Sequence, residues 1–192
     1  MKEIKLKNIN GIKVIDGRVI PTPKKDIINK YCYKVLTTKA MQFSIIYPDY
    51  LKLIEINKEF DEEALTKEGD IVIKKSYPFD PCYIFKEDEN LLVSSFSVVI
   101  RDLPSDVNVG YLLAYLDSER GFEEINKTLT DSKSKIIMSK NQLLELNVLL
   151  PDIKTQKEIG DKFLSNLKIV RKTSKCIKEN LIMVDSLLKQ KE

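Results

Sequence analysis

The sequence predicts an α+β protein, in which a globule of short strands with a few helices is followed by one long C-terminal helix of the coiled-coil type. Three observations predict this arrangement: short β-branched runs separated by turns, a change to helical spacing of apolar residues near Val109, and an amphipathic stretch over residues 155–191. The boundary is expected at Pro151, with a globular domain over residues 1–150 and a helical one over residues 151–192.

The globule is expected to consist mainly of short strands. Residues 1–20 alternate loosely between apolar and polar side chains and contain turn signals, which is typical of short strands or a hairpin. Further strands are expected where β-branched and aromatic residues cluster between turns. These segments are residues 31–36, 45–47, 51–56, 71–73, 83–85 and 91–100, and the last has the strongest strand composition.

Helical spacing replaces strand alternation in the last part of the globule. Apolar residues recur at third and fourth positions over residues 109–118, and a second short helix is expected over residues 121–129. Ser139 is suited to cap a brief helix that ends at Leu146, because its hydroxyl can accept a hydrogen bond from a free backbone N–H. A last strand is expected over residues 148–150.

The C-terminal helix has a start signal and a narrow apolar seam. Thr155 and Glu158 fit a capping box, in which each side chain satisfies a backbone donor beside the other. Further along, apolar residues recur with alternating steps of four and three, which is the heptad pattern of a coiled coil. The seam consists of Phe163, Leu167, Val170, Ser174, Ile177, Leu181, Val184 and Leu188. We expect it to form a dimer interface, with a serine as its one polar member.

The length of this helix exceeds what a small globule covers. At roughly 1.5 Å per residue, residues 155–191 form a rod on the order of 55 Å long. Part of the seam therefore needs another helix as its partner. A core helix within a single domain is the alternative interpretation, and the length and the narrow apolar stripe both count against it.

The composition excludes several classes of protein. The chain has no histidine and three isolated cysteines, Cys32, Cys82 and Cys176, so a zinc site, a catalytic triad and a disulfide framework are not expected. No apolar run reaches the roughly 18 residues that span a bilayer, and the N-terminus lacks a signal-peptide pattern. We therefore expect a cytoplasmic protein without a metal site or membrane contact.

Charge is unevenly distributed, although the net charge is only +3. Residues 1–40 hold ten Lys and Arg against three acids, whereas residues 41–120 hold eight against sixteen. Residues 151–192 are basic again, with ten against six. Two interpretations stay open: an ordinary solvated surface, or basic parts that face a polyanion such as nucleic acid.

The motifs of small-molecule enzymes are missing or weak. The six glycines are isolated, so no glycine-rich phosphate loop is present and no nucleotide cofactor is expected. The run Asp80-Pro81-Cys82-Tyr83 is close to the D-P-P-Y motif of amino-methyltransferases, but its second proline is missing and a turn is the simpler interpretation. The chain is therefore expected to be non-catalytic.

The order of several loose motifs resembles the specificity subunits of type I restriction–modification systems. The run over residues 65–75, the strand that ends at Arg101 and the helical run over residues 110–118 are similar to the target-recognition domain of that family. Residues 138–159 are similar to the junction into its long helix. This junction departs from the family pattern at Asp152, where a proline is usual, and at Thr155, where a glutamate is usual.

The resemblance implies a division of labour. The globule would recognise one half of a split target in double-stranded DNA, and the long helix would pair antiparallel with a second helix and hold the half-sites apart. A complete subunit of this family carries two such units in tandem, so a single unit implies a half-subunit that forms a homodimer on an inverted-repeat target. Methylation and cleavage would belong to partners: DNA methyltransferase subunits and, where one exists, a restriction subunit.

Base recognition in a duplex groove needs hydrogen-bond donors on loops, with Lys or Arg for guanine and Asn or Gln for adenine. The DNA-binding candidates lie on three loops: Lys74, Lys75, Ser76 and Tyr77; Ser132, Lys133, Ser134 and Lys135; and Lys24 and Lys25. Phosphate contact is the more common role for any one lysine. An ordinary surface lysine is the alternative for each of them.

Two other functional classes stay open. One is a non-enzymatic coiled-coil adaptor whose globule binds a protein, an alternative that the acidic residues 41–120 support. The other is a compact enzyme, which the missing histidine and the missing phosphate loop disfavour. A neighbouring gene for an adenine methyltransferase would favour DNA recognition over the adaptor.

Overall fold

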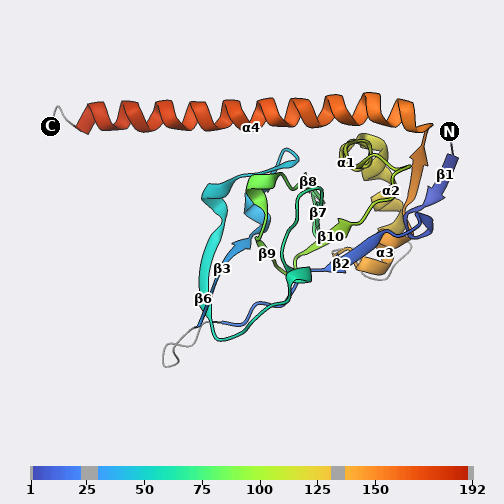
Figure 1. Ribbon diagram of the computed structural model, residues 1–192, viewed down its shortest axis with the longest axis horizontal. Coiled ribbons are helices and arrows are strands. Elements are labelled where there is room, and N and C mark those ends of the chain that lie inside the picture. The colour runs from blue at the N-terminus through green and yellow to red at the C-terminus, as the bar shows by residue number, and fades with distance from the viewer. Residues whose placement is uncertain (1, 23–29, 131–136, 190–192) are drawn as a thin grey trace.

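The computed structural model describes residues 2–22, 30–130 and 137–189, and it has the α+β architecture that the sequence predicts. A globule of short strands and helices lies along one side of a single long helix (Figure 1). The strands are β1 (Lys2–Lys5), β2 (Lys13–Asp16), β3 (Tyr31–Leu36), β4 (Met41–Gln42), β5 (Ile45–Ile46), β6 (Lys52–Ile56), β7 (Ile71–Lys74), β8 (Pro81–Tyr83), β9 (Leu92–Val93), β10 (Ser97–Arg101) and β11 (Asn147–Leu150). The helices are α1 (Val109–Asp117), α2 (Glu119–Thr130), α3 (Lys140–Leu144) and α4 (Ile153–Lys189).

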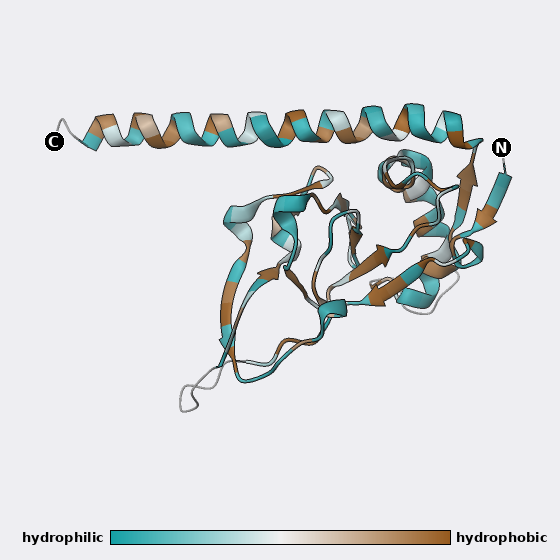
Figure 2. Ribbon diagram, in the orientation of Figure 1, coloured by the Kyte–Doolittle hydropathy of each residue, from teal (hydrophilic) through white to brown (hydrophobic). Residues whose placement is uncertain are grey.

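A four-stranded antiparallel sheet with the order β2-β10-β7-β8 forms the centre of the globule. Its strands are rich in β-branched residues, whose side chains pack well on a pleated surface. Alternate residues enter two different cores: Ile71 and Ile73 pack in the same cluster as α1, whereas Val72 and Val99 pack on the opposite face. Both faces of the sheet are therefore buried, which explains why these strands are almost continuously apolar (Figure 2).

Three smaller sheets surround this centre. Strands β6, β3 and β9 form one of them, β4 and β5 form a hairpin, and β1 pairs with β11. The last pairing, in which Lys2 lies opposite Leu150, brings the first described residues beside the start of α4 (Figure 1). Strands β1 and β2 therefore do not form a hairpin with each other but pair with distant segments.

Two strand predictions were wrong. The strand expected over residues 83–85 is β8, which spans Pro81–Tyr83 and includes only Tyr83 of that range. Residues 91–100 form not one strand but two, β9 and β10, which belong to different sheets. The N–H of Ser97 donates to the carbonyl of Ser94 over 3.0 Å and closes a turn between them. The continuous run of apolar residues predicted burial correctly. It does not indicate which sheet each half of this segment belongs to.

The start of α4 is also different from the prediction. The helix begins at Ile153, and Asp152 caps it: its Oδ1 accepts from the N–H of Thr155 over 3.1 Å, and its Oδ2 accepts from the Thr155 hydroxyl over 2.7 Å. Aspartate is as good a cap as threonine and comes first in the chain, so Thr155 is displaced into the first turn. The N-cap at Ser139, by contrast, is confirmed, and its side chain also forms a capping box with Gln142.

A buried ion pair joins the end of β10 to the turn before β7. The Arg101 guanidinium donates to both oxygens of Asp70, over 2.8 and 2.7 Å, and Asp70 is only 1% exposed. Asp70 also accepts from the N–H of Lys67, and Arg101 also donates to the Leu65 carbonyl. Every charge in this pair is therefore matched by hydrogen bonds, which is the condition under which a buried ion pair persists.

We expect Arg101→Met to lower the free energy of unfolding by about 3–5 kcal/mol, because Asp70 would stay buried without its partner. Urea denaturation measures this change. Lys13→Met is the matched control: Lys13 pairs with Asp102 on the surface, where an ion pair contributes little to stability. Equal effects of the two substitutions would contradict the structural role given to Arg101.

Candidate functional site

Four segments meet at one end of the four-stranded sheet, and we call them together the loop end. They are residues 16–18, 75–77, 94–96 and 137–138. The N–H of Lys75 donates to the Phe96 carbonyl over 2.9 Å, and the N–H of Met138 donates to the Lys75 carbonyl over 2.7 Å. Segments far apart in the sequence are therefore held together by backbone hydrogen bonds.

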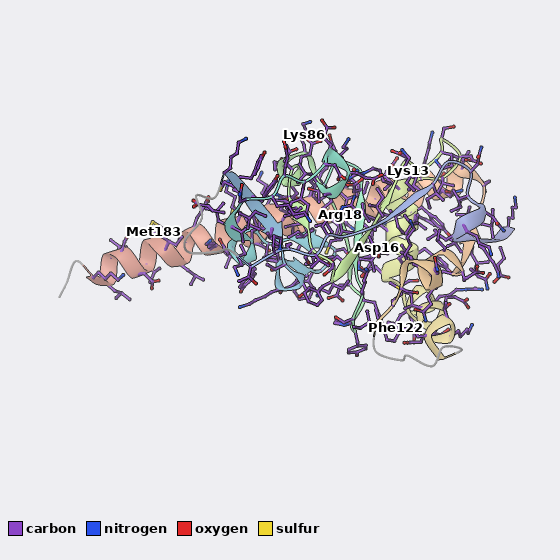
Figure 3. All side chains as sticks on the ribbon, turned by 90° about the horizontal axis from the view of Figure 1, so that it is seen from below. Lys13, Asp16, Arg18, Lys86, Phe122 and Met183 are labelled. Carbon is purple, nitrogen blue, oxygen red and sulfur yellow. The ribbon has the colours of Figure 1, made fainter. Side chains whose placement is uncertain are left out.

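Gly17 permits the closest approach within the loop end. A Cβ atom at this position would lie 2.0 Å from the Ser94 carbonyl oxygen, so a larger residue would push two backbones apart. The backbone of the next residue, Arg18, forms hydrogen bonds with Val93 and Ser95. Asp16 and Arg18 thus lie on a segment that is fixed by its neighbours (Figure 3).

Two of the candidate DNA-binding lysines are engaged in ion pairs. The ammonium group of Lys74 lies 2.5 Å from an oxygen of Asp80, and that of Lys75 lies 2.5 Å from an oxygen of Asp16. The side chains of both lysines are largely covered, but Asp16 is more exposed than Asp80, at 47% against 31%. The ion pair of Lys75 is therefore the more open of the two to an external anion.

Ser76 and Tyr77 are exposed at the tip of the same loop. Tyr77 is 73% exposed, and its ring makes edge contacts with Phe79 and with Phe122 of α2, at centroid distances of 6.3 and 6.0 Å. Ser76 forms a β-bridge with Ile137. The loop therefore presents a hydroxyl group and a supported aromatic ring to the outside.

Phe96 and Ile137 belong to the same surface, although the sequence did not single them out. Phe96 is 65% exposed and Ile137 is 53% exposed, and both lie beside Lys75 and Ser76 through the backbone contacts described above. Phe96 was missed because it lies in the middle of the strand that was predicted over residues 91–100. The serines that flank it on both sides were the signal for a turn.

The remaining DNA-binding candidates, Ser132, Lys133, Ser134, Lys135, Lys24 and Lys25, lie outside the described residues. The first described residue after the Ser132–Lys135 segment is Ile137, which pairs with Ser76. The loop end is thus connected directly to one of these segments in the chain.

A second functional element is the contact between α4 and the globule. Gly110 of α1 and Gly160 of α4 meet backbone to backbone: a Cβ on Gly160 would lie 2.0 Å from Asn108 Oδ1 and 2.4 Å from the Tyr111 nitrogen. Helices approach this closely only where side chains are absent. Leu167, about two turns further along, is buried in the same core.

Gln156 fixes the start of α4 with three hydrogen bonds. Its Oε1 accepts from the N–H of Asn108 over 3.0 Å, and its Nε2 donates to the carbonyls of Asp106 and Pro151 over 3.2 and 2.9 Å. The Asn108 side chain in turn caps α1 by accepting from the N–H of Tyr111. One buried amide therefore links the beginnings of two helices.

Two ion pairs continue the contact along α4. Arg171 makes a bidentate pair with Asp88 and lies over the ring of Phe85, with 5.4 Å between the guanidinium carbon and the ring centroid. Lys178 pairs with Asp49. Burial raises the pKa of the Asp88 carboxyl, while its hydrogen bonds with Arg171 act in the opposite direction. The globule thus holds the helix from its start to Lys178.

The predicted seam divides into two parts. Leu167 is 6% exposed and packs within its own chain, and Phe163 is partly buried against the same core. Ser174 is also partly covered. The other members, Val170, Ile177, Leu181, Val184 and Leu188, are exposed. The first part of α4 is therefore a core helix, as the alternative interpretation had it, and the later part carries an uncovered apolar face.

Neither a metal site nor a membrane-spanning helix is found among the residues that the structure describes. Over residues 2–22, 30–130 and 137–189, no group of three or more Cys, Asp and Glu side chains is arranged to hold a metal ion. Within the same ranges, no helix is long and apolar enough to cross a membrane.

Comparison with known proteins gives a likeness of structure. No protein-family model matches the sequence, and no curated protein matches it. The type I restriction–modification S subunit from M. genitalium superimposes with a TM-score of 0.62 at 14% identity, over 98% of this chain and 44% of that one. The HsdS subunit from Thermoanaerobacter tengcongensis gives 0.57 at 14% identity, over 90% and 39%.

The type IIG restriction endonuclease BpuSI contains a similar unit, with a TM-score of 0.59 at 11% identity over 84% of this chain and 26% of the endonuclease. At such identities the likeness establishes the fold. The chain has the fold of type I specificity subunits, as the sequence resemblance implied, and it spans about two fifths of the length of those solved subunits.

We expect Gly160→Ala to lower the free energy of unfolding by about 1–3 kcal/mol, because the added methyl group overlaps the α1 backbone. The higher helix propensity of alanine, about 1 kcal/mol, acts against this loss and is smaller than the clash. Thermal unfolding measures the change. Ser165→Ala, at an exposed position of the same helix, is the control and should be neutral or slightly stabilising; a Gly160 variant as stable as this control would contradict the close crossing.

Proposed function

We propose that the chain is one DNA-recognition unit of a type I restriction–modification specificity subunit, and that it reads one half-site of double-stranded DNA. The observation that carries the proposal is the fold: a globule with a docked long helix, similar to solved S subunits over 90–98% of this chain. In this proposal the chain is non-catalytic, acts in the cytoplasm, and sets only the sequence at which a complex acts.

The loop end is the proposed DNA-reading surface. It gathers short, exposed polar and aromatic side chains, Ser76 and Tyr77 among them, on a backbone that is fixed by hydrogen bonds. Hydroxyl groups can bond to base edges, and apolar side chains such as Phe96 and Ile137 can contact the thymine methyl group. A rigid scaffold with exposed loop residues is what precise positioning of such contacts requires.

The exposed face of α4 is the proposed association surface. Val170, Ile177, Leu181, Val184 and Leu188 recur at coiled-coil spacing on a face of the helix that the globule does not cover. A homodimer through this face would present two loop ends and would therefore read an inverted repeat.

The other proposed partners are DNA methyltransferase subunits, which would supply the chemistry, and a restriction subunit where one exists. One solved chain of similar fold comes from work on complex assembly of the type I restriction–modification system. A similar fold over 93% of this chain supports the same place for this protein.

A coiled-coil adaptor whose globule binds a protein is the second candidate. The observation that favours it is the loop end itself, where Lys75 is already paired with Asp16 and three exposed side chains, Tyr77, Phe96 and Ile137, are apolar or aromatic. Such a surface is less basic than most DNA-binding surfaces.

Selection from a randomised duplex library separates the two candidates. The purified chain, alone and with its methyltransferase subunit, is mixed with the library, and the bound DNA is sequenced. DNA recognition predicts enrichment of one short sequence that occurs as an inverted repeat with a fixed spacer. Bound DNA with no enriched sequence would contradict the function proposed here and would leave the adaptor as the better account.

We expect two substitutions within one ion pair to change DNA affinity in opposite directions. Lys75→Ala should weaken binding about tenfold at low salt and reduce the salt dependence by about one phosphate contact, because it removes a cation. Asp16→Asn should strengthen binding, because it removes a carboxylate that repels phosphate and frees Lys75. Fluorescence anisotropy over a range of salt concentrations measures both.

Lys86→Ala is the control for this pair, since Lys86 is exposed and lies away from the loop end (Figure 3). It should leave affinity unchanged. If Lys75→Ala and Asp16→Asn both weaken binding to the same degree, their ion pair merely supports the fold, and the loop end is not the DNA-reading surface.

We expect Leu181→Asp to abolish association of the chain without unfolding it, because Leu181 is 61% exposed and contacts no core of its own chain. A charge in an apolar seam lacks a partner and is costly to bury. Sedimentation equilibrium measures the mass, and circular dichroism checks the fold. Lys172→Asp is the control on an exposed polar position of α4; equal masses for the Leu181 variant and the parent would refute this interface.

A further inference from the structure

A small cavity lies beside the loop end, between residues 78–81 and the helices α1 and α2; Phe122 of α2 is labelled in Figure 3. Its volume is about 230 Å³, below the roughly 300–1,000 Å³ of pockets for drug-sized ligands. Its walls are apolar and partly aromatic, and they consist of Pro78, Phe79, Pro81, Leu116, Phe122 and Ile125. The cavity therefore suits a small molecule or a single side chain with an apolar body.

Two carboxylates, Asp80 and Asp117, are the charged groups that line this cavity. Asp80 is ion-paired, since the ammonium group of Lys74 lies 2.5 Å from one of its oxygens. Asp117 is exposed, and no lysine or arginine in the described part of the chain is among the groups that act on it. One lysine thus faces two carboxylates, and the cavity carries one negative charge without a counter-charge.

Asp117 occupies a position that disfavours an ionised carboxyl group. Partial burial raises its pKa, a contact with the Ser44 hydroxyl acts in the opposite direction, and repulsion from Asp80 raises the pKa further. Asp117 is also the last residue of α1, where the partial negative charge of the helix end repels an anion. A carboxylate that is kept in such a place, at the wall of a cavity, is a candidate for binding a ligand.

A buried hydroxyl group supports Asp117 from behind. Ser44 is only 1% exposed, and its Oγ makes no hydrogen bond of normal geometry within the described ranges, although it faces the Asp117 carboxyl. The Ser44 carbonyl accepts from the N–H of Tyr83 over 3.0 Å, which fixes this residue in place. A hydroxyl that donates to a carboxylate stabilises its ionised form. Ser44 is thus placed to hold Asp117 toward a bound cation.

The walls distinguish an organic cation from a metal ion. Ca²⁺ and Mg²⁺ need about six or more oxygen ligands, and among the described residues no group of three or more Cys, Asp and Glu is arranged to hold a metal. An ammonium or guanidinium group, by contrast, needs one carboxylate and gains from aromatic rings beside it. Phe79 and Phe122 supply such rings at this cavity.

We propose that this cavity binds a small organic cation, an alkylguanidinium or alkylammonium group, with Asp117 as its counter-ion and the rings of Phe79 and Phe122 against its apolar part. The cation is either a free ligand or the side chain of an arginine or lysine in another chain. Tyr77 of the loop end packs on the same two rings, at centroid distances of 6.3 and 6.0 Å, so the bound cation lies one side chain away from the loop end. This binding site does not depend on the function proposed above.

An NMR titration of the full chain tests the site, with the methyl signals of Leu116 and Ile125 as reporters. Butylguanidinium should shift these signals saturably, with a dissociation constant on the order of 1 mM. Butylurea has a similar shape and no charge, and it should leave the signals unchanged. An acetylated and amidated Gly-Gly-Arg-Gly-Gly peptide separates the two sources: tighter binding than butylguanidinium assigns the cavity to a side chain of another chain, and weaker binding assigns it to a free ligand.

Three variants locate the binding. Asp117→Asn should weaken the binding of butylguanidinium about tenfold, because it removes the counter-ion and keeps the shape of the side chain. Lys74→Met should strengthen it, because Asp80 then lacks its internal cation. Asp185→Asn, at an exposed position near the end of α4, is the control and should change nothing. Equal shifts with butylurea, no shift with butylguanidinium, or an Asp117→Asn chain that binds as tightly as the parent would overturn the cation site.

Discussion

The contact of Gly110 with Gly160 determines how the two parts of the molecule are related. At this crossing the backbones of α1 and α4 touch, and the Gln156 amide joins the starts of both helices. The direction of α4 relative to the globule therefore depends on backbone atoms and one buried amide, not on flexible surface side chains. A helix that sets the distance between two sites would need this kind of attachment. Any rotation at the crossing would cause a larger displacement at the far end of the helix.

The loop end and the exposed face of α4 both depend on that attachment. Arg171 and Lys178 extend the contact with ion pairs to Asp88 and Asp49, so the globule supports α4 over most of its length and leaves the last turns uncovered. The same helix thus serves two purposes. Its docking side belongs to the core of the globule, and its exposed apolar face, which includes Ile177 and Leu181, is available for a second copy. Two loop ends in such a dimer would have one fixed separation.

Periodicity in the sequence predicted the elements better than their partners. The α+β class, the long helix and the strand at 71–73 follow from local patterns, and all are present. The sheet assignments of β1, β2, β9 and β10 depend on pairings between distant segments, which local patterns do not contain. The heptad steps placed Leu167 in the association seam, although it lies in the core, because a period of 3.5 cannot separate two adjacent apolar faces of one helix.

The candidate site was predicted only in part, again because contacts between separate segments cannot be read from local patterns. Ser76 and Tyr77 are exposed as expected, but Lys74 and Lys75 are ion-paired with Asp80 and Asp16, and local patterns in the sequence do not predict these contacts.

The central claim, that two loop ends on a two-fold dimer read two half-sites, is tested most directly by hydroxyl-radical footprinting of the assembled dimer on its enriched duplex. The account predicts two protected segments related by two-fold symmetry and separated by unprotected DNA. A single protected segment would contradict it.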